Sequence, residues 1–255
     1  MTHTTKRAAS LVAVFCMLVS LVASFGCVNA SADTTFANFY SSEVYFSKYG
    51  VTDRYVFIQT DGSHNNQEVY AHYKYGTMYN NETGEWDEVW GDSLAQYVTT
   101  LSDGSKIWKA SIRNNGGESQ YAIKYVANGV EYWNNNNGND FTTETLGDNC
   151  NITINRGGCN YYYGSYISAV VKNLAYEKTV KVRVTYDNWN SYEDVALGYS
   201  DTRADGTEVW NVRLDKQIAN YENFHYCLYY TVNGQTYWAN NFGANYDTTT
   251  KLYPY

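Results

Sequence analysis

The stretch from Tyr226 to Gly243, Tyr-Cys-Leu-Tyr-Tyr-Thr-Val-Asn-Gly-Gln-Thr-Tyr-Trp-Ala-Asn-Asn-Phe-Gly, decides the fold class of this chain. Aromatic and β-branched residues lie on both sides of Asn233-Gly234, a dipeptide typical of a tight two-residue hairpin turn. Neighbouring side chains on a strand point to opposite faces, so one of Tyr237 and Trp238 should face the core and the other solvent. The stretch predicts a β-hairpin that carries an exposed aromatic ring.

The same pattern occurs earlier in the chain, which indicates an internal duplication. The residues Tyr125, Asn128, Gly129, Tyr132, Trp133, Asn135, Asn136 and Gly138 match Tyr230, Asn233, Gly234, Tyr237, Trp238, Asn240, Asn241 and Gly243. Further upstream, Asp92, Tyr97, Asp103, Gly104 and Trp108 match Asp194, Tyr199, Asp205, Gly206 and Trp210. Each copy is therefore one structural unit of about 100 residues, which is an ordinary domain size.

Strand signals dominate both copies. Alternating apolar and polar residues occur at 54–58, 68–73, 181–186 and 226–230, separated by Asn, Asp and Gly clusters. We predict an all-β chain of two tandem immunoglobulin-like β-sandwich domains. The expected boundaries are 33–146 for the first domain, 147–159 for a linker, 160–247 for the second domain and 248–255 for a C-terminal tail.

The N-terminal residues 1–32 are typical of a signal peptide. Lys6 and Arg7 precede an apolar or small run from Ala8 to Gly26, and the small residues Ala30-Ser31-Ala32 follow. An uncleaved anchor and a lipid on Cys27 are the alternatives. No later apolar stretch approaches the about 20 residues that cross a bilayer, so we expect no membrane insertion after cleavage. The expected location is secreted or on the cell surface.

Composition excludes some partners. The net charge is −8 and the Lys and Arg residues are scattered, which argues against nucleic acid. The chain is rich in aromatic residues, with 28 Tyr and 7 Trp, and Tyr suits either a hydrated recognition surface or a β-rich core.

Three cysteines follow residue 32: Cys150, Cys159 and Cys227. Cys150 and Cys159 flank a short loop and could form a disulfide in an exported protein. Cys227 lies in an apolar run and is expected to be buried. Because no His or second Cys lies at ligand spacing beside any of them, we expect no metal, and no cofactor is implied.

An exposed aromatic ring beside two Asn residues suits a sugar. The ring stacks on the C–H face of a pyranose, and the amides supply donors and acceptors to its hydroxyl groups. The alternative is an Asn-rich loop whose side chains cap their own backbone, with both aromatic rings in the core.

The run from Lys172 to Trp189, together with Tyr237 to Tyr246, resembles the family 21 carbohydrate-binding modules, which bind starch and glycogen. The resemblance spans about 162–246, and the first copy, about 35–141, is a weaker match. It implies an immunoglobulin-like sandwich that binds α-glucan at up to two sites. It also implies an Asp where Ala239 and Asn134 stand here.

The resemblance also implies site residues by motif position. Trp189 and Trp238 would be the stacking platform of one site, with Asn240 and Asn245 as hydrogen-bonding partners. Tyr176, Lys178 and Tyr199 would form the other site. In the first copy, Trp133 and Asn135 correspond to Trp238 and Asn240, and Trp86 lies near the position of Trp189. Asn65 stands where Tyr176 would be expected, so the second site of the first copy is in doubt, and Trp108 and Trp210 are interpreted as core residues.

An enzyme is not expected. Glu85, Asp87, Glu88 and Asp92 cluster near Trp86 and Trp90, and two carboxylates at suitable spacing could hydrolyse a glycosidic bond. A solvated acidic loop is the favoured interpretation.

The hypothesis from sequence is an exported, non-catalytic protein that binds α-glucan as starch, glycogen or malto-oligosaccharides. Binding is expected to be bivalent, and protein partners in a starch-degrading assembly are a further expectation. The rival hypothesis is a structural or adhesive surface protein whose β-sandwiches bind a protein partner.

Overall fold

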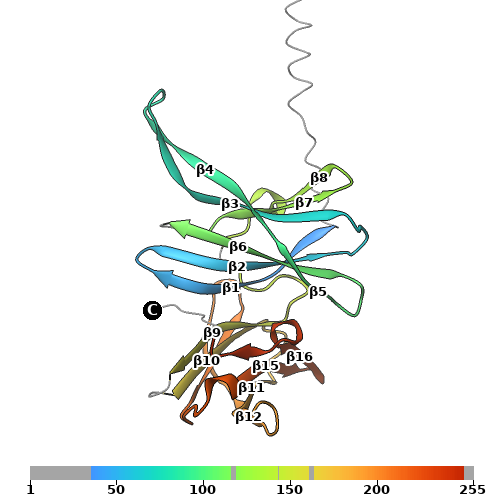
Figure 1. Ribbon diagram of the computed structural model, residues 1–255, viewed down its shortest axis with the longest axis vertical. Coiled ribbons are helices and arrows are strands. Elements are labelled where there is room, and N and C mark those ends of the chain that lie inside the picture. Colours follow the sequence, from blue (N-terminus) through green and yellow to red (C-terminus); the bar gives the residue numbers. More distant parts are fainter. Residues whose placement is uncertain (1–35, 116–118, 143, 161–163, 250–255) are drawn as a thin grey trace, which may run out of the picture.

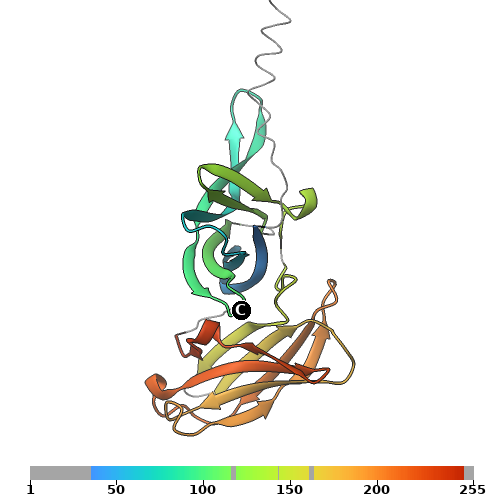
Figure 2. The same cartoon turned by 90° about the vertical axis from the view of Figure 1, so that its right-hand side faces the viewer.

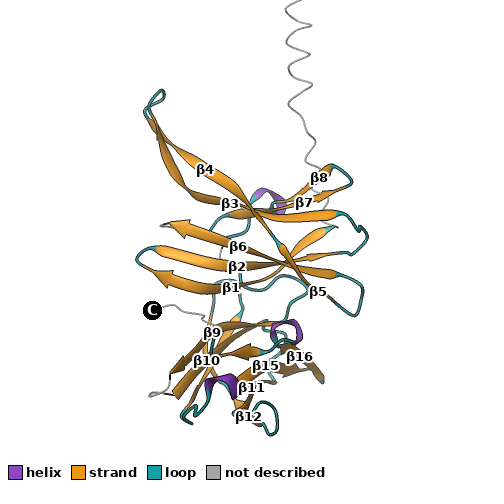
Figure 3. Ribbon diagram, in the orientation of Figure 1, coloured by secondary structure: helices purple, strands orange, loops and turns teal. Residues whose placement is uncertain are grey.

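The computed structural model describes residues 36–115, 119–142, 144–160 and 164–249, and these residues are almost entirely β-strands and connections (Figure 3). The first half contains β1 (Ala37–Lys48), β2 (Val51–Thr60), β3 (Gln67–Asn80), β4 (Glu85–Leu94), β5 (Gln96–Thr100), β6 (Lys106–Asn115), β7 (Tyr121–Ala127), β8 (Val130–Asn134) and the 3-10 turn η1 (Asn136–Gly138). The all-β prediction is confirmed.

The second half contains β9 (Ile152–Asn160), β10 (Gly164–Val171), β11 (Lys178–Thr185), β12 (Glu193–Ala196), β13 (Gly198–Thr202), β14 (Glu208–Leu214), β15 (His225–Val232), β16 (Gln235–Ala239) and β17 (Tyr246–Asp247). Two further 3-10 turns, η2 (Tyr221–Asn223) and η3 (Asn241–Gly243), lie in its loops. In Figure 1 this half lies below the first.

The two halves share one strand order. The first forms antiparallel sheets β1-β2-β6-β5 and β4-β3-β7-β8, and the second forms β9-β10-β14-β13 and β12-β11-β15-β16, with β17 added to β15. Each strand of the first half thus has its counterpart eight places later. The same strand order thus occurs in both halves, whereas the tandem duplication and the immunoglobulin-like arrangement stay predictions.

Each half encloses its own hydrophobic core between its two sheets (Figure 2). In the second half the core joins Ile167 on β10 to Val182 on β11 and Leu228 on β15, all fully buried. Alternation along β11 buries every second residue from Val180 to Val184 and leaves the residues between them on the outer face. The outer face of this sheet is consequently free to carry other side chains.

The two hairpins form as predicted. Asn233 and Gly234 have φ values of 51° and 75°, and Asn128 and Gly129 have 52° and 76°, as a two-residue turn with positive φ at both positions requires. Tyr237 packs against the core of the second half, whereas the Trp238 side chain is 45% exposed.

The linker prediction is wrong in its extent, because the range 147–159 contains most of β9, which pairs with β10 inside the second sandwich. The Gly- and Asn-containing run resembles a loop, but its Ile152 and Ile154 side chains alternate into the core.

The predicted disulfide is also wrong. The side chain of Cys159 lies outside the described residues, but its backbone is part of β9, and Cys150 precedes that strand. A strand from residue 152 to 159 extends roughly 20 Å, while bridged cysteines have Cα atoms less than about 7 Å apart. Cys150 is a free, buried thiol that donates to the Ile152 carbonyl at 3.3 Å. Cys227 is buried, as predicted.

The expected signal peptide, residues 1–32, and residues 250–255 of the expected tail lie outside the described part of the chain. Within that part, no helix is long and apolar enough to span a bilayer.

The two halves contact each other through β1, β9 and the η3 turn. The Phe242 ring lies 5.9 Å from the Tyr40 ring and 5.2 Å from the Phe57 ring. Beside these rings, the buried Glu43 carboxylate accepts hydrogen bonds of 3.3 Å from the Tyr246 and Thr153 hydroxyl groups. Burial raises the pKa of Glu43 to about 7, although these hydrogen bonds oppose the shift.

We predict that Glu43 makes stability depend on pH. Because the folded protein holds this proton more tightly than the unfolded chain, the contribution of Glu43 to the free energy of unfolding is greatest below pH 4.5 and falls as the pH rises to about 7. The total change is about 3 kcal/mol. Glu43→Gln should remove this contribution, so urea unfolding at pH 4.5 and 7.5 should show the variant more stable than the parent at pH 7.5 only. An equal pH dependence in both proteins would contradict this assignment.

Candidate functional site

The outer face of the sheet β12-β11-β15-β16 carries the exposed Trp238 ring. Trp238 on β16 packs against Tyr229 on β15, with ring centroids 4.9 Å apart. The Arg183 guanidinium lies 5.4 Å from the Trp238 ring and makes two hydrogen bonds of 2.7 and 2.8 Å to the Asp194 carboxylate. Those bonds raise the pKa of Arg183 and lower that of Asp194. The Trp238 indole is therefore supported by Tyr229 and Arg183 and remains 45% exposed to solvent.

Trp189 stands on the β11–β12 loop in a backbone conformation that a bulky residue rarely adopts, with φ of 68°. The loop fixes this conformation with its own side chains. The Trp189 amide donates to the Thr185 hydroxyl at 2.9 Å, and the Asp187 carboxylate accepts from both the amide and the hydroxyl of Ser191. The Ser191 hydrogen bonds lower the pKa of Asp187. Such strain is typical of positions that present a functional side chain.

The two indoles lie over the same strand. Trp189 stacks on His225 with ring centroids 6.4 Å apart and an interplanar angle of 14°, and Trp238 packs on Tyr229. His225 and Tyr229 are four residues apart on β15, which is about 13 Å along a strand. Cys227, with its short side chain, lies between them. The structure therefore brings both predicted platform residues, Trp189 and Trp238, to one sheet face, with the short Cys227 side chain between the residues that they pack on.

The Asn side chains that were predicted to hydrogen-bond a sugar make other contacts. The Asn240 Oδ1 accepts from the Gly243 amide at 3.2 Å, and the Asn135 Oδ1 accepts from the Gly138 amide at 3.0 Å. Asn245 is half-buried at φ of 61°. The Asn240 and Asn135 oxygens thus cap their own turns, as the alternative had it, but the Trp238 ring is exposed and not in the core as that alternative also required. The loop that contains Asn240 also presents Phe242 to the first half.

A separate pocket of about 690 Å³ lies at the edge between the two sheets of the second half. It is lined by Asn173, Ala175, Tyr176, Lys178, Tyr199, Thr202, Glu208 and Trp210. Tyr176 is 93% exposed, and the Tyr199 hydroxyl forms a 2.8 Å hydrogen bond with Thr202. The pocket thus combines two accessible tyrosines with a polar floor.

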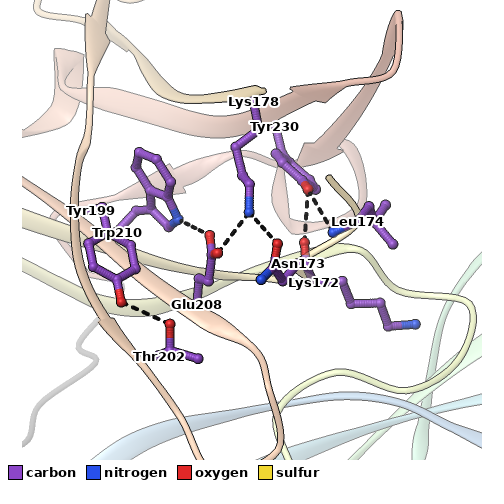
Figure 4. Close-up of polar contacts among 9 residues, drawn as sticks. All are labelled: Lys172, Asn173, Leu174, Lys178, Tyr199, Thr202, Glu208, Trp210 and Tyr230. Carbon is purple, nitrogen blue, oxygen red and sulfur yellow. Dashed lines mark hydrogen bonds and ion pairs between the residues drawn. The ribbon is translucent and has the colours of Figure 1, made fainter. Parts of the chain in front are cut away.

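Figure 4 shows how the floor is built. The Lys178 ammonium donates to the Glu208 carboxylate at 2.7 Å and to the Asn173 Oδ1 at 2.6 Å, and its side chain is only 4% exposed. The other Glu208 oxygen accepts from the Trp210 Nε1 at 3.0 Å. Lys178 is therefore a buried positioning residue rather than an exposed donor.

Trp210 was interpreted from sequence as a core residue, and the structure gives it a second role. It packs against the core, but its ring also lies edge-on to Tyr199 at 5.8 Å and lines the pocket. The strand alternation could not reveal this, because the pocket also needs Tyr176, Lys178 and Tyr199 from other segments.

In the first half, the equivalent of this pocket is altered. Tyr97 and Trp108 keep the edge-on contact, at 5.7 Å. By strand register, however, Gln67 and Lys106 stand where the second half has Lys178 and Glu208. The ion pair that orders the floor is consequently replaced, which agrees with the doubt raised by Asn65.

The other two predicted residues of the first half lie on one face of the sheet β4-β3-β7-β8. Trp133 contacts His72 edge-on at 5.2 Å, and the Trp86 side chain is 67% exposed on β4. Trp86 lies on a strand, not on a loop like that of Trp189.

Two of the four acidic residues near Trp86, Glu88 and Asp92, are ion-pair partners. The Glu88 carboxylate accepts from Lys74 at 2.5 Å and from the Trp90 Nε1 at 3.2 Å, and these bonds lower the pKa of Glu88. Burial would raise the pKa of Asp92, but hydrogen bonds from Lys124 and His72 outweigh it and lower the pKa. Neither carboxyl group has the raised pKa of a general acid. Among the described residues, no group of three His, Cys, Asp or Glu side chains could hold a metal.

Comparison with known proteins identifies the region that carries these features. Residues 163–249 match the family described as "Carbohydrate/starch-binding module (family 21)". The chain is 46% identical over 80 residues to human "Protein phosphatase 1 regulatory subunit 3B", and 39% identical over 80 residues to bovine "Protein phosphatase 1 regulatory subunit 3C". Each alignment covers 30% of this chain, and it covers 28% of the human and 25% of the bovine protein.

Among solved structures, "Solution structure of the carbohydrate binding module of the muscle glycogen-targeting subunit of Protein Phosphatase-1" is similar at 21% identity. The superposition has a TM-score of 0.33 and covers 38% of this chain and 73% of that one. The family match concerns one copy, in the second half of the chain, and not the two copies expected from the duplication.

We predict that the folded state depends on the Lys178–Glu208 ion pair, because each buried charge needs the other as its partner. Lys178→Met should lower the free energy of unfolding by about 3 kcal/mol, because it leaves the Glu208 carboxylate buried without its ammonium partner. Adding Glu208→Gln should recover most of that loss. The matched control is Arg213→Met, which breaks the exposed pair with Asp215 and should cost less than about 1 kcal/mol. Urea unfolding measures all three, and equal losses for Lys178→Met and Arg213→Met would refute the assignment.

Proposed function

We propose that this chain binds α-glucan, as starch, glycogen or malto-oligosaccharide, through the second sandwich and without catalysis. The observation that carries the proposal is the pair of indoles, Trp189 and Trp238, on one outer sheet face within the region that matches the carbohydrate-binding module. The pocket with Tyr176 and Tyr199 supplies a second site on the same sandwich.

The charges of both sites favour an uncharged ligand. Arg183 is neutralised by Asp194, and Lys178 by Glu208, so that a sugar would meet rings and neutral pairs rather than a free charge. A sugar that stacks on such a ring need not displace a strongly hydrated ion. The separation of the indoles along β15 suits a chain that contacts the face at two points.

Export and a secreted or surface location remain part of the proposal, because they rest on residues 1–32 alone. The relatives are named as regulatory subunits of a protein phosphatase, so their names suggest a phosphatase partner rather than the starch-degrading assembly expected from sequence. Because each alignment covers only 30% of this chain, we limit the proposed partner of this chain to the polysaccharide.

Affinity electrophoresis in gels with amylopectin, glycogen or no polysaccharide tests the proposal. We expect retardation by both polymers, weakened about tenfold by Trp238→Ala or Trp189→Ala, because each removes a stacking ring. Tyr176→Ala should weaken retardation less, since the indole face remains.

The control is Tyr166→Ala, which removes an exposed ring from the other sheet of the same sandwich and should leave retardation unchanged. Circular dichroism checks that each variant is folded. Absence of retardation of the parent protein by either polymer would exclude α-glucan binding and favour the rival, a structural or adhesive protein that binds a protein partner.

A further inference from the structure

The outer face of the sheet β4-β3-β7-β8 in the first half carries a ring cluster that resembles that of the second half. Trp133 on β8 lies opposite Lys124 on β7, as Trp238 on β16 lies opposite Tyr229 on β15. On the next strands, His72 pairs with Asp92 as Arg183 pairs with Asp194. Trp90 precedes Asp92 by two residues, as Tyr192 precedes Asp194. Equivalent positions thus hold a Trp, a second ring, a basic side chain and an Asp, whereas Lys124 stands in the place of Tyr229.

The contacts within this cluster resemble those of the second half. The His72 ring stacks on Trp90 at 5.4 Å with an interplanar angle of 13°, and the Asp92 carboxylate accepts from both His72 and Lys124. Lys124 lies 5.8 Å from the Trp133 ring, much as Arg183 lies 5.4 Å from Trp238. Rings held beside paired charges are therefore common to both faces.

Only the first half continues this face beyond its sheet. β3 pairs with β7 as far as Tyr73, and from there the β3–β4 hairpin extends alone to Glu85, projecting from the sandwich (Figures 1 and 2). We call residues 75–90 the arm. Its turn is fixed, because the Asn80 Oδ1 accepts from the amides of Glu82 and Thr83, and Gly84 has φ of 75°.

The arm carries the row of rings outward. Trp86, Glu88, Trp90 and Asp92 alternate on β4 and so share one face. Near the tip, Trp86 lies edge-on to Tyr79 at 5.4 Å, and the two side chains are 67% and 47% exposed. Trp86 and Trp90 are four residues apart, which is about 13 Å along the strand. We call Trp133, His72, Trp90, Tyr79 and Trp86 the aromatic track.

We propose that the aromatic track binds an α-glucan chain independently of the second sandwich. The charges beside it are already paired, Lys74 with Glu88 and Asp92 with Lys124, so the track suits a neutral ligand. Its rings are not coplanar: Tyr79 and Trp86 meet at 64°, and His72 and Trp133 at 89°. A flat ribbon of sugars could not stack on such rings in succession, whereas a curved chain can turn to meet each one.

This inference deepens the proposed function and rests on it for the identity of the ligand. It gives the first half a binding surface, so that one molecule can hold a polymer at two places. Two tethered weak sites raise the apparent affinity for a polymer by about 10² or more when both reach it.

Indole N–H signals in a ¹⁵N–¹H spectrum separate the two surfaces, because the chain has seven Trp residues and single variants assign each signal. The probe is maltoheptaose, with cellohexaose as the flat-chain comparison. We expect the Trp86, Trp90 and Trp133 signals to shift with maltoheptaose, in addition to those of Trp189 and Trp238. Cellohexaose should shift none of the first three.

A second measurement uses gels with amylopectin. In a background with Trp189→Ala, Trp238→Ala and Tyr176→Ala, which weakens both sites of the second sandwich, residual retardation should persist and should fall about tenfold on adding Tyr79→Ala and Trp86→Ala. Met78→Ala is the matched control, because this exposed side chain lies on the opposite face of the arm, and it should change nothing.

The outcomes distinguish the two proposals. If the Trp189 and Trp238 signals do not respond to maltoheptaose, the proposed function of the second sandwich fails. If they respond but the Trp86, Trp90 and Trp133 signals do not, and the arm variants bind as their background does, the aromatic track is not a glucan site. Larger shifts with cellohexaose would overturn the assignment of a curved ligand.

Discussion

Side-chain alternation across a β-strand is the constraint on which the rest of this structure depends. Each sheet has one face committed to the core, as Val180, Val182 and Val184 show on β11, and the opposite face receives every residue in between. A slip of one residue would bury Arg183 and expose the valines, so the core alone fixes the register. That register places Trp238 and Arg183 within reach of each other. The binding face is therefore a consequence of how the core packs.

The outer faces are then ordered by charge pairs, not by burial. An exposed indole on a sheet could rotate freely, but Arg183, fixed by Asp194, lies 5.4 Å from Trp238 and supports it. In the first half the same support comes from Lys124 and His72, both bonded to Asp92. Exposed ion pairs contribute little to the free energy of unfolding, so their role here is to hold the rings in position. They keep the rings accessible beside paired charges.

The sequence predicted local features of this structure better than features that depend on contacts between distant residues. The Asn-Gly turns and the opposite orientation of Tyr237 and Trp238 follow from the turn residues and alternation, and both were predictable. The linker and the disulfide were wrong because β9 looks like a loop in isolation; it becomes a strand only by pairing with β10. The role of the Asn240 oxygen was one of two open alternatives, decided by the geometry of η3.

The pocket and the arm required tertiary information. Trp210 lines a pocket because Lys178 and Glu208, 30 residues apart, meet beside it, and no spacing rule announces that contact. The arm exists because β3 pairs with β7 only as far as Tyr73, whereas its pairing with β4 continues to Asn80. Sequence alone could locate Trp86 but not show that it stands on a projecting hairpin rather than on a loop.

The two halves also show why matching residues one by one underestimates their likeness. On β3 and β7 of the first half, Tyr70 lies opposite Lys124, whereas on β11 and β15 of the second half Lys181 lies opposite Tyr229. The ring and the cation have changed places across the strand pair, so neither position matches, although the face holds the same two chemical groups. The Lys124 ammonium still lies 4.6 Å from the Tyr70 ring. Adjacent strands present their side chains to one ligand together, so it is the content of the pair that a sugar meets. Two halves with one strand order can thus share their surface chemistry while their aligned residues differ.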